Sequence, residues 1–69
     1  MNNGVVKWFN SQKGYGFIED ESGMNLFVHY TDLNMAGYKA LDVGQPVEYE
    51  VKEGSKGPQA IKVSKLYSI

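Results

Sequence analysis

Short runs of β-branched and aromatic residues alternate along this chain with clusters of turn-forming residues. Each run has the length of one strand, and none has the spacing of apolar residues that a stable helix requires. Three of the connections are short and contain glycine, as tight hairpins do. The pattern predicts a small all-β domain whose strands span residues 5–10, 15–19, 25–30, 46–53 and 59–65.

The order of these strands indicates the fold. Hairpin turns make successive strands antiparallel. The connection 31–45 is long, and although Thr31 or Asp32 can begin one helical turn there, no long apolar face follows. Three strands, a long link and two more strands fit a five-stranded antiparallel Greek-key barrel of the oligonucleotide-binding (OB) type. We therefore expect residues 1–69 to form a single domain.

Length and composition limit what can stabilise this domain. A chain of 69 residues buries only about 60% of its unfolded surface, which allows one thin core. Without cysteine it has neither disulfides nor thiolate metal ligands, and we expect no metal and no cofactor. The sequence shows no secretory signal and no stretch near the ~20 apolar residues of a membrane span. We therefore expect a cytoplasmic protein with no membrane partner.

The charge of the chain does not by itself identify a partner. Seven lysines, without arginine, are balanced by eight acidic residues, and the net charge is −1. If the partner is a polyanion, the lysines must gather on one face, and another interaction must supply much of the affinity.

The two faces of each predicted strand differ in composition, because successive strand residues point to opposite sides. In the last two strands apolar residues alternate with polar ones, as expected for a core side and a water side. In the second and third strands both sides are apolar or aromatic. A barrel has only one interior, so one of these two sets must face outward. The predicted inward set is Val6, Gly16, Ile18, Leu26, Val28, Val47, Tyr49, Val51, Ile61 and Val63.

The outward set is then aromatic. It consists of Trp8, Tyr15, Phe17, Phe27 and His29, with Tyr30 and Tyr38 alongside. Half-accessible rings in this number would expose roughly 500 Å² of surface, which usually marks a binding site. The opposite assignment would turn Ile18, Leu26 and Val28 to water and bury the imidazole of His29.

Nucleobases are the ligand that best suits such a surface. Each base stacks on an aromatic ring with roughly 1 to 3 kcal/mol, with little dependence on sequence. Lys7 and Lys13 flank the rings and can reach phosphates. The side chains that can hydrogen-bond base edges are Asn10, Asn25 and Gln59. Lys39 and Lys56, in loops, are equally well explained as solvated charges.

Four segments resemble the cold-shock domain family. KGYGFI at 13–18 and LFVHY at 26–30 resemble its two ribonucleoprotein-type motifs, and GVVKWFN at 4–10 and GPQA at 57–60 are also similar. The resemblance spans essentially the whole chain, at the length of a free-standing bacterial cold-shock protein. It implies an RNA chaperone that binds single-stranded RNA and DNA with low sequence specificity and regulates transcription and translation, often after a temperature drop.

The resemblance also implies roles for individual residues. Stacking positions correspond to Trp8, Tyr15, Phe17, Phe27, His29, Tyr30 and Tyr38. Polar contacts correspond to Lys7, Asn10, Lys13, Lys56 and Gln59. Tyrosine stands at three positions where phenylalanine is commoner, and Asn25 replaces the usual aspartate. An amide both donates and accepts hydrogen bonds, so base preference near Asn25 is an open question.

Two alternative functions suit the residues of this chain less well. An enzyme is not expected, because the chain has one histidine, no cysteine and no glycine loop of the nucleotide-binding type, and we expect no small-molecule substrate. A module that binds proline-rich peptides is the stronger alternative, since small barrels with aromatic grooves also do this. We expect a monomer, although the link 31–45 is long enough for two copies to exchange residues 46–69.

Overall fold

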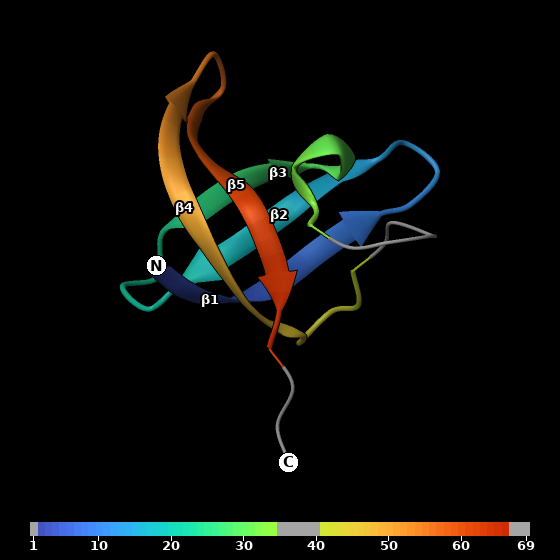
Figure 1. Cartoon of the computed structure of the whole chain (residues 1–69), viewed down its shortest axis with the longest axis horizontal. Coiled ribbons are helices and arrows are strands. Elements are labelled where there is room, and N and C mark those ends of the chain that lie inside the picture. The colour runs from blue at the N-terminus through green and yellow to red at the C-terminus, as the bar shows by residue number, and fades with distance from the viewer. Residues whose placement is uncertain (1, 35–40, 67–69) are drawn as a thin grey trace.

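Five strands close into a barrel in the computed structural model, which describes residues 2–34 and 41–66 (Figure 1). The strands are β1 (Asn2–Asn10), β2 (Tyr15–Asp20), β3 (Asn25–His29), β4 (Pro46–Gly54) and β5 (Gly57–Lys65). A short 3₁₀ helix, η1 (Tyr30–Asp32), follows β3 where the sequence predicted one helical turn. The five predicted strands are confirmed, with differences only at their ends.

The strand order around the barrel is β1-β2-β3-β5-β4, and β4 pairs with β1 to close it. The predicted five-stranded OB-type barrel is therefore confirmed. All neighbouring pairs are antiparallel except β3 and β5, which run parallel where Phe27 lies opposite Gln59. The parallel pair follows from the long link, because hairpins determine the direction only of strands that they join.

The core lies inside the barrel and is mainly aliphatic. Its completely buried members come from all five strands, as the alternation predicted, and Leu33 and Leu41 add to it from the two described ends of the long link. The buried side chains are Val6, Ile18, Leu26, Leu33, Val28, Leu41, Val47, Tyr49, Ala60 and Val63.

Two predicted core residues are not buried. The register between β4 and β5 shifts so that β5 holds one extra residue, and Lys62 there has a φ of 52°. This bulge turns both Ala60 and Val63 inward and leaves Ile61 only half-buried. Val51 keeps the inward parity but is 43% exposed, because this end of the β4–β5 hairpin projects beyond the barrel (Figure 1).

A second bulge lies in β1. Val6 is opposite Ile18 and Trp8 is opposite Phe17, so Lys7 is the extra residue. Strict alternation would give Val6 and Trp8 the same orientation. The bulge instead buries Val6 and exposes Trp8.

Candidate functional site

Three aromatic side chains stand side by side on the outer surface of β1, β2 and β3. Phe17 lies opposite Trp8 on one side and opposite Phe27 on the other. The ring centroids of Trp8 and Phe17 are 6.3 Å apart with their planes at 30°, and those of Phe17 and Phe27 are 6.1 Å apart at 75°. These distances are typical of contacting aromatic pairs.

Tyr15 joins these three rings from the next outward position of β2. Its ring centroid is 5.5 Å from that of Trp8 and 5.9 Å from that of Phe27. The rings of Trp8, Tyr15, Phe17 and Phe27 therefore form one continuous surface, which we call the aromatic platform. Trp8 is 41% exposed and Phe17 37%, while Tyr15 and Phe27 are half-buried.

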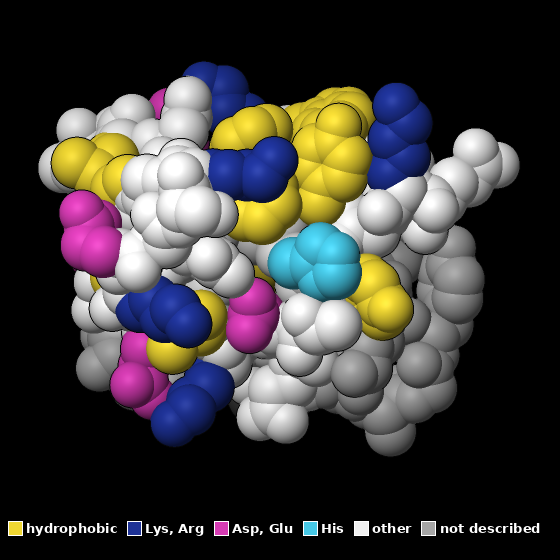
Figure 2. Space-filling model, turned by 90° about the horizontal axis from the view of Figure 1, so that it is seen from above, with side chains coloured by type: hydrophobic (Ala, Val, Ile, Leu, Met, Phe, Trp, Pro, Cys, Tyr) yellow, Lys and Arg dark blue, Asp and Glu magenta, His cyan; other side chains and the backbone are white. Residues whose placement is uncertain are grey.

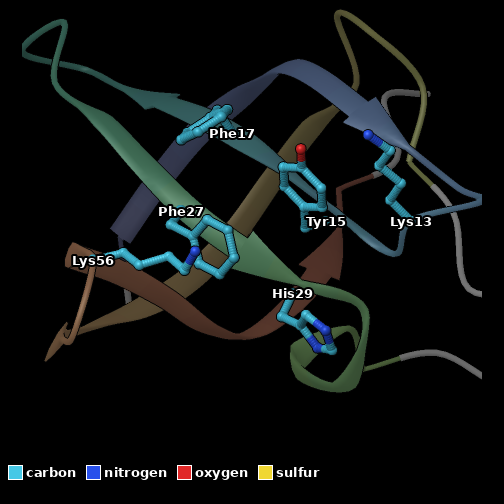
Figure 3. A pocket seen from close by; sticks show the side chains of 6 residues that line it. All are labelled: Lys13, Tyr15, Phe17, Phe27, His29 and Lys56. Atoms are coloured by element: carbon cyan, nitrogen blue, oxygen red, sulfur yellow. The ribbon is translucent and has the colours of Figure 1, made fainter.

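A groove of about 410 Å³ runs over the platform. Figure 3 shows that Lys13 and Lys56 lie at opposite ends of the groove, with aromatic rings between them. Dark blue lysine side chains also border the yellow hydrophobic surface in Figure 2. The groove thus combines apolar faces with a cation at each end. Its lining residues are Lys13, Tyr15, Phe17, Phe27, His29 and Lys56.

Lys56 makes a specific contact with the platform. Its ammonium nitrogen is 5.6 Å from the centroid of the Phe27 ring, within the range of a cation–π interaction. Lys56 belongs to the two-residue turn between Gly54 and Gly57. A loop lysine that the sequence explained equally well as a solvated charge is therefore part of the groove.

His29 extends the aromatic surface at the end of β3. Its ring lies 4.7 Å from the ring of Tyr30, which is 44% exposed. The Nδ1 atom of His29 is 2.9 Å from the hydroxyl oxygen of Thr31 and accepts a longer hydrogen bond, 3.4 Å, from the Thr31 backbone N–H. Thr31 therefore orients the imidazole.

Two of the predicted amide side chains, those of Asn10 and Gln59, already have hydrogen-bond partners within the chain. The side-chain oxygen of Asn10 accepts hydrogen bonds from the backbone N–H groups of Gln12 (3.0 Å) and Lys13 (2.9 Å), and so shapes the turn between β1 and β2. The Gln59 amide donates a 2.9 Å hydrogen bond to the Asp32 carboxylate. Neither amide is as free for base edges as the sequence suggested.

Lys7 and Asn25 are predicted site residues that do not line the groove. Asn25 is opposite Glu19, in the outward row that follows Phe17 and Phe27. The Lys7 ammonium is 3.5 Å from the Glu19 carboxylate, and both side chains are about half exposed. Two further predicted site residues, Tyr38 and Lys39, lie outside the described residues.

Thr31 and Asp32 were not predicted as part of the site. The sequence identified them only as possible beginnings of a helical turn, and strand alternation says nothing about residues beyond the end of a strand. Their places depend on η1, which brings them against the platform side of β3 and β5.

Within the described part of the chain, the pKa is perturbed for two ionisable groups, which are structural and lie away from the platform. Hydrogen bonds from the Ser22 side chain and the Met24 backbone lower the pKa of Asp20, which organises the turn between β2 and β3. Burial raises the pKa of Tyr49, whose hydroxyl donates to the carbonyl of Asn3. Neither group is placed to perform chemistry in the groove.

Within residues 2–34 and 41–66, no three histidine, cysteine or acidic side chains lie close enough together to hold a metal ion. The same part of the chain contains no helix of the length and apolar character needed to span a membrane.

Comparisons with known proteins agree with this geometry. Residues 2–66 match the family described as the 'Cold-shock' DNA-binding domain. Over 66 residues, the chain is 58% identical to cold shock-like protein CspLB of Listeria monocytogenes and 56% identical to cold shock protein CspD of Bacillus subtilis. Each alignment covers 96% of this chain and 100% of the relative.

A solved structure has the same fold. The structure titled drosophila Unr CSD456 superposes on 96% of this chain with a TM-score of 0.77 and 25% sequence identity. The chain spans 26% of that longer protein chain, so the likeness concerns a part of it.

Proposed function

Because the chain belongs to the cold-shock domain family, whose members bind nucleic acids, we propose that it binds single-stranded RNA and DNA with low sequence specificity by stacking bases on the aromatic platform. The observation that supports this most directly is the contact of four outward rings, three of which line a groove with a lysine at each end. Stacking contributes roughly 1 to 3 kcal/mol per base, so a few bases suffice for useful affinity.

The preference for single strands follows from the shape of the ligand that aromatic rings can accept. In a duplex the faces of each base are covered by its neighbours, and only the base edges are open in the grooves. A ring can stack only on a base that has left such a stack. The platform therefore favours unpaired RNA or DNA.

The lysines at the ends of the groove suit the backbone of such a strand. With bases lying on the rings, Lys13 can approach a phosphate at one end. Lys56 lies over the Phe27 face that a base would use, so the proposal requires its flexible side chain to move aside and meet a phosphate instead.

A binding role of this kind supports a wider biological role. A protein that stacks unpaired bases without strong sequence preference opposes the formation of RNA structure. We propose that the chain acts in this way as an RNA chaperone and a regulator of transcription and translation in the cold-shock response. We propose that the protein has a single domain, is a monomer and acts by binding and not as an enzyme. Its need for access to RNA supports a cytoplasmic location.

Titration of Trp8 fluorescence tests the proposal. Oligothymidine should quench the emission because a base stacks on the indole, and the same ligand at saturation should raise the melting temperature. A duplex of equal length and a proline-rich peptide are the comparison ligands and should have little effect. Quenching by the peptide alone, or an unchanged melting temperature in saturating oligothymidine, would show that the groove has another occupant.

A further inference from the structure

Asp32 and Gln59 form a polar pair at one end of the platform. The Gln59 amide nitrogen donates to the Asp32 Oδ2 atom at 2.9 Å, and both side chains are partly buried. The bond joins β5 to η1 across 27 residues of sequence. One of the two amide hydrogens of Gln59 is therefore used in this hydrogen bond, and the acceptor is the Asp32 carboxylate.

The position of this pair relative to the rings follows from the sheet. Gln59 is the β5 residue opposite Phe27, so the row formed by Trp8, Phe17 and Phe27 continues into Gln59. The Gln59 side chain therefore connects the Asp32 carboxylate to the row that contains Phe27. A base stacked on Phe27 can present its edge to this carboxylate.

A carboxylate at that place has two effects on a single strand. It repels phosphates, so the backbone is expected nearer to Lys13 and Lys56 than to Asp32. It also accepts hydrogen bonds only, and two adjacent donors on a base edge can satisfy both of its oxygens. Guanine has such donors, N1–H and the 2-amino group, whereas thymine and uracil have the single donor N3–H.

We propose that Asp32, held by Gln59, makes the Phe27 end of the platform prefer guanine over thymine or uracil. This proposal rests on the proposed function, because it concerns a base already stacked on Phe27. The platform itself tolerates any base, and the carboxylate adds a preference at one position of the bound strand. The Gln59 amide keeps the carboxylate from turning away.

The test uses Trp8 fluorescence titrations with an oligothymidine of about seven nucleotides and with strands in which one guanine replaces each thymine in turn. The parent chain should bind one of these strands about fivefold more tightly than oligothymidine, the low end of what a bidentate edge contact provides. Inosine, which lacks the 2-amino group, should lose most of this preference at the same position.

The decisive variant is Asp32→Asn, which can still accept the hydrogen bond from Gln59 and so should keep its melting temperature. We expect it to bind the guanine strand and oligothymidine equally. Glu21→Gln, an exposed site in the turn between β2 and β3, removes the same charge elsewhere and should keep the fivefold ratio.

The other outcomes would contradict either the role of Asp32 alone or the proposed function as well. Equal binding of all strands by the parent chain, or a ratio unchanged in Asp32→Asn, overturns the role of Asp32 and leaves the proposed function intact. Failure of the parent chain to bind any strand overturns both.

Discussion

Phe17 and Ile18 are neighbours in β2 and have opposite environments. Phe17 is 37% exposed and contacts the rings of Trp8 and Phe27, whereas Ile18 is completely buried among the aliphatic side chains of the barrel. One residue belongs to the proposed binding surface and the other to the core. Substitutions at these two positions should therefore affect binding and stability separately.

Phe17→Ala should weaken the binding of oligothymidine by about 1 to 3 kcal/mol, because it removes a stacking surface, and should cost little stability. Ile18→Ala should lower the free energy of unfolding by about 2 to 5 kcal/mol, because it leaves a cavity in the core. Fluorescence titration and chemical denaturation measure the two effects. A Phe17→Ala chain that unfolds beside a stable Ile18→Ala chain would invert the assignment of the two faces.

Gly16, between Tyr15 and Phe17, occupies a place that has no room for a side chain. It is buried and lies opposite Phe9 in β1. A β-carbon there would lie 2.7 Å from the Phe9 Cα and would collide with the Trp8 carbonyl oxygen. Backbone atoms cannot yield easily, so the close approach of β1 and β2 beneath the platform requires glycine.

Gly16→Ala should therefore lower the free energy of unfolding by about 3 kcal/mol and change the emission of Trp8, because β1 must move away from β2. Gly23→Ala is the matched control. Its β-carbon meets no atom within 4 Å, although its φ of 91° costs about 1 kcal/mol. Thermal melts and emission spectra of both variants provide the comparison. Equal losses of stability would show that β1 and β2 are not in tight contact at Gly16.

Among the elements, β1 and β5 each contain a bulge that redirects side chains. The extra residue in β1 turns Trp8 onto the platform, and the extra residue in β5 brings both Ala60 and Val63 into the core. Lys62, at the β5 bulge, has a φ of 52°. This left-handed conformation favours glycine, which is common in one class of bulge.

Lys62→Gly should raise the free energy of unfolding by about 0.5 to 1 kcal/mol, because relief from the left-handed strain exceeds the entropy cost of glycine. The ammonium of Lys62 lies 3.8 Å from the Glu50 carboxylate, but both side chains are largely exposed and the pair contributes little. Lys52→Gly, in a regular part of β4, should instead destabilise by about 0.5 to 1 kcal/mol. Denaturation curves distinguish the two, and a loss of stability in both variants would contradict the argument.

For the whole molecule, the distribution of charge matters more than its sum. The net charge is −1, yet lysines stand at both ends of the groove. If Lys7, Lys13, Lys39 and Lys56 all met phosphates, the log–log dependence of affinity on salt would reach a slope of about −2.8. Among the lysines that the structure describes, only Lys13 and Lys56 line the groove, and two such contacts give a slope of about −1.4.

Affinity for a short oligothymidine should then fall only about 7-fold between 50 and 200 mM salt, because stacking supplies most of the binding energy. Lys13→Gln should flatten the slope by about 0.7, whereas Lys62→Gln, outside the groove, should leave it unchanged. Titrations at several salt concentrations measure these slopes. A parent slope steeper than about −4 would mean that charge supplies most of the binding energy.

The features that the sequence predicted are those that depend on local patterns. Alternation with a period of two identified the strands, and glycine-bearing clusters identified the hairpin turns. Because one barrel cannot bury both faces of β2 and β3, the outward placement of Tyr15, Phe17 and Phe27 also followed from the sequence. The short segments resembling a known family led to the same fold.

The remaining features depend on how segments distant in the sequence fit together. Strict alternation misplaced Ile61 and offers no reason for Trp8 to face outward, because a bulge arises from the register between two strands and leaves no mark in the spacing of one. Alternation gave Val51 the correct orientation but could not show that its end of the β4–β5 hairpin projects beyond the barrel. The parallel contact of β3 with β5 brings Gln59 opposite Phe27 and within reach of Asp32. Only the closed barrel decides this contact, since the long link between β3 and β4 permits more than one strand order.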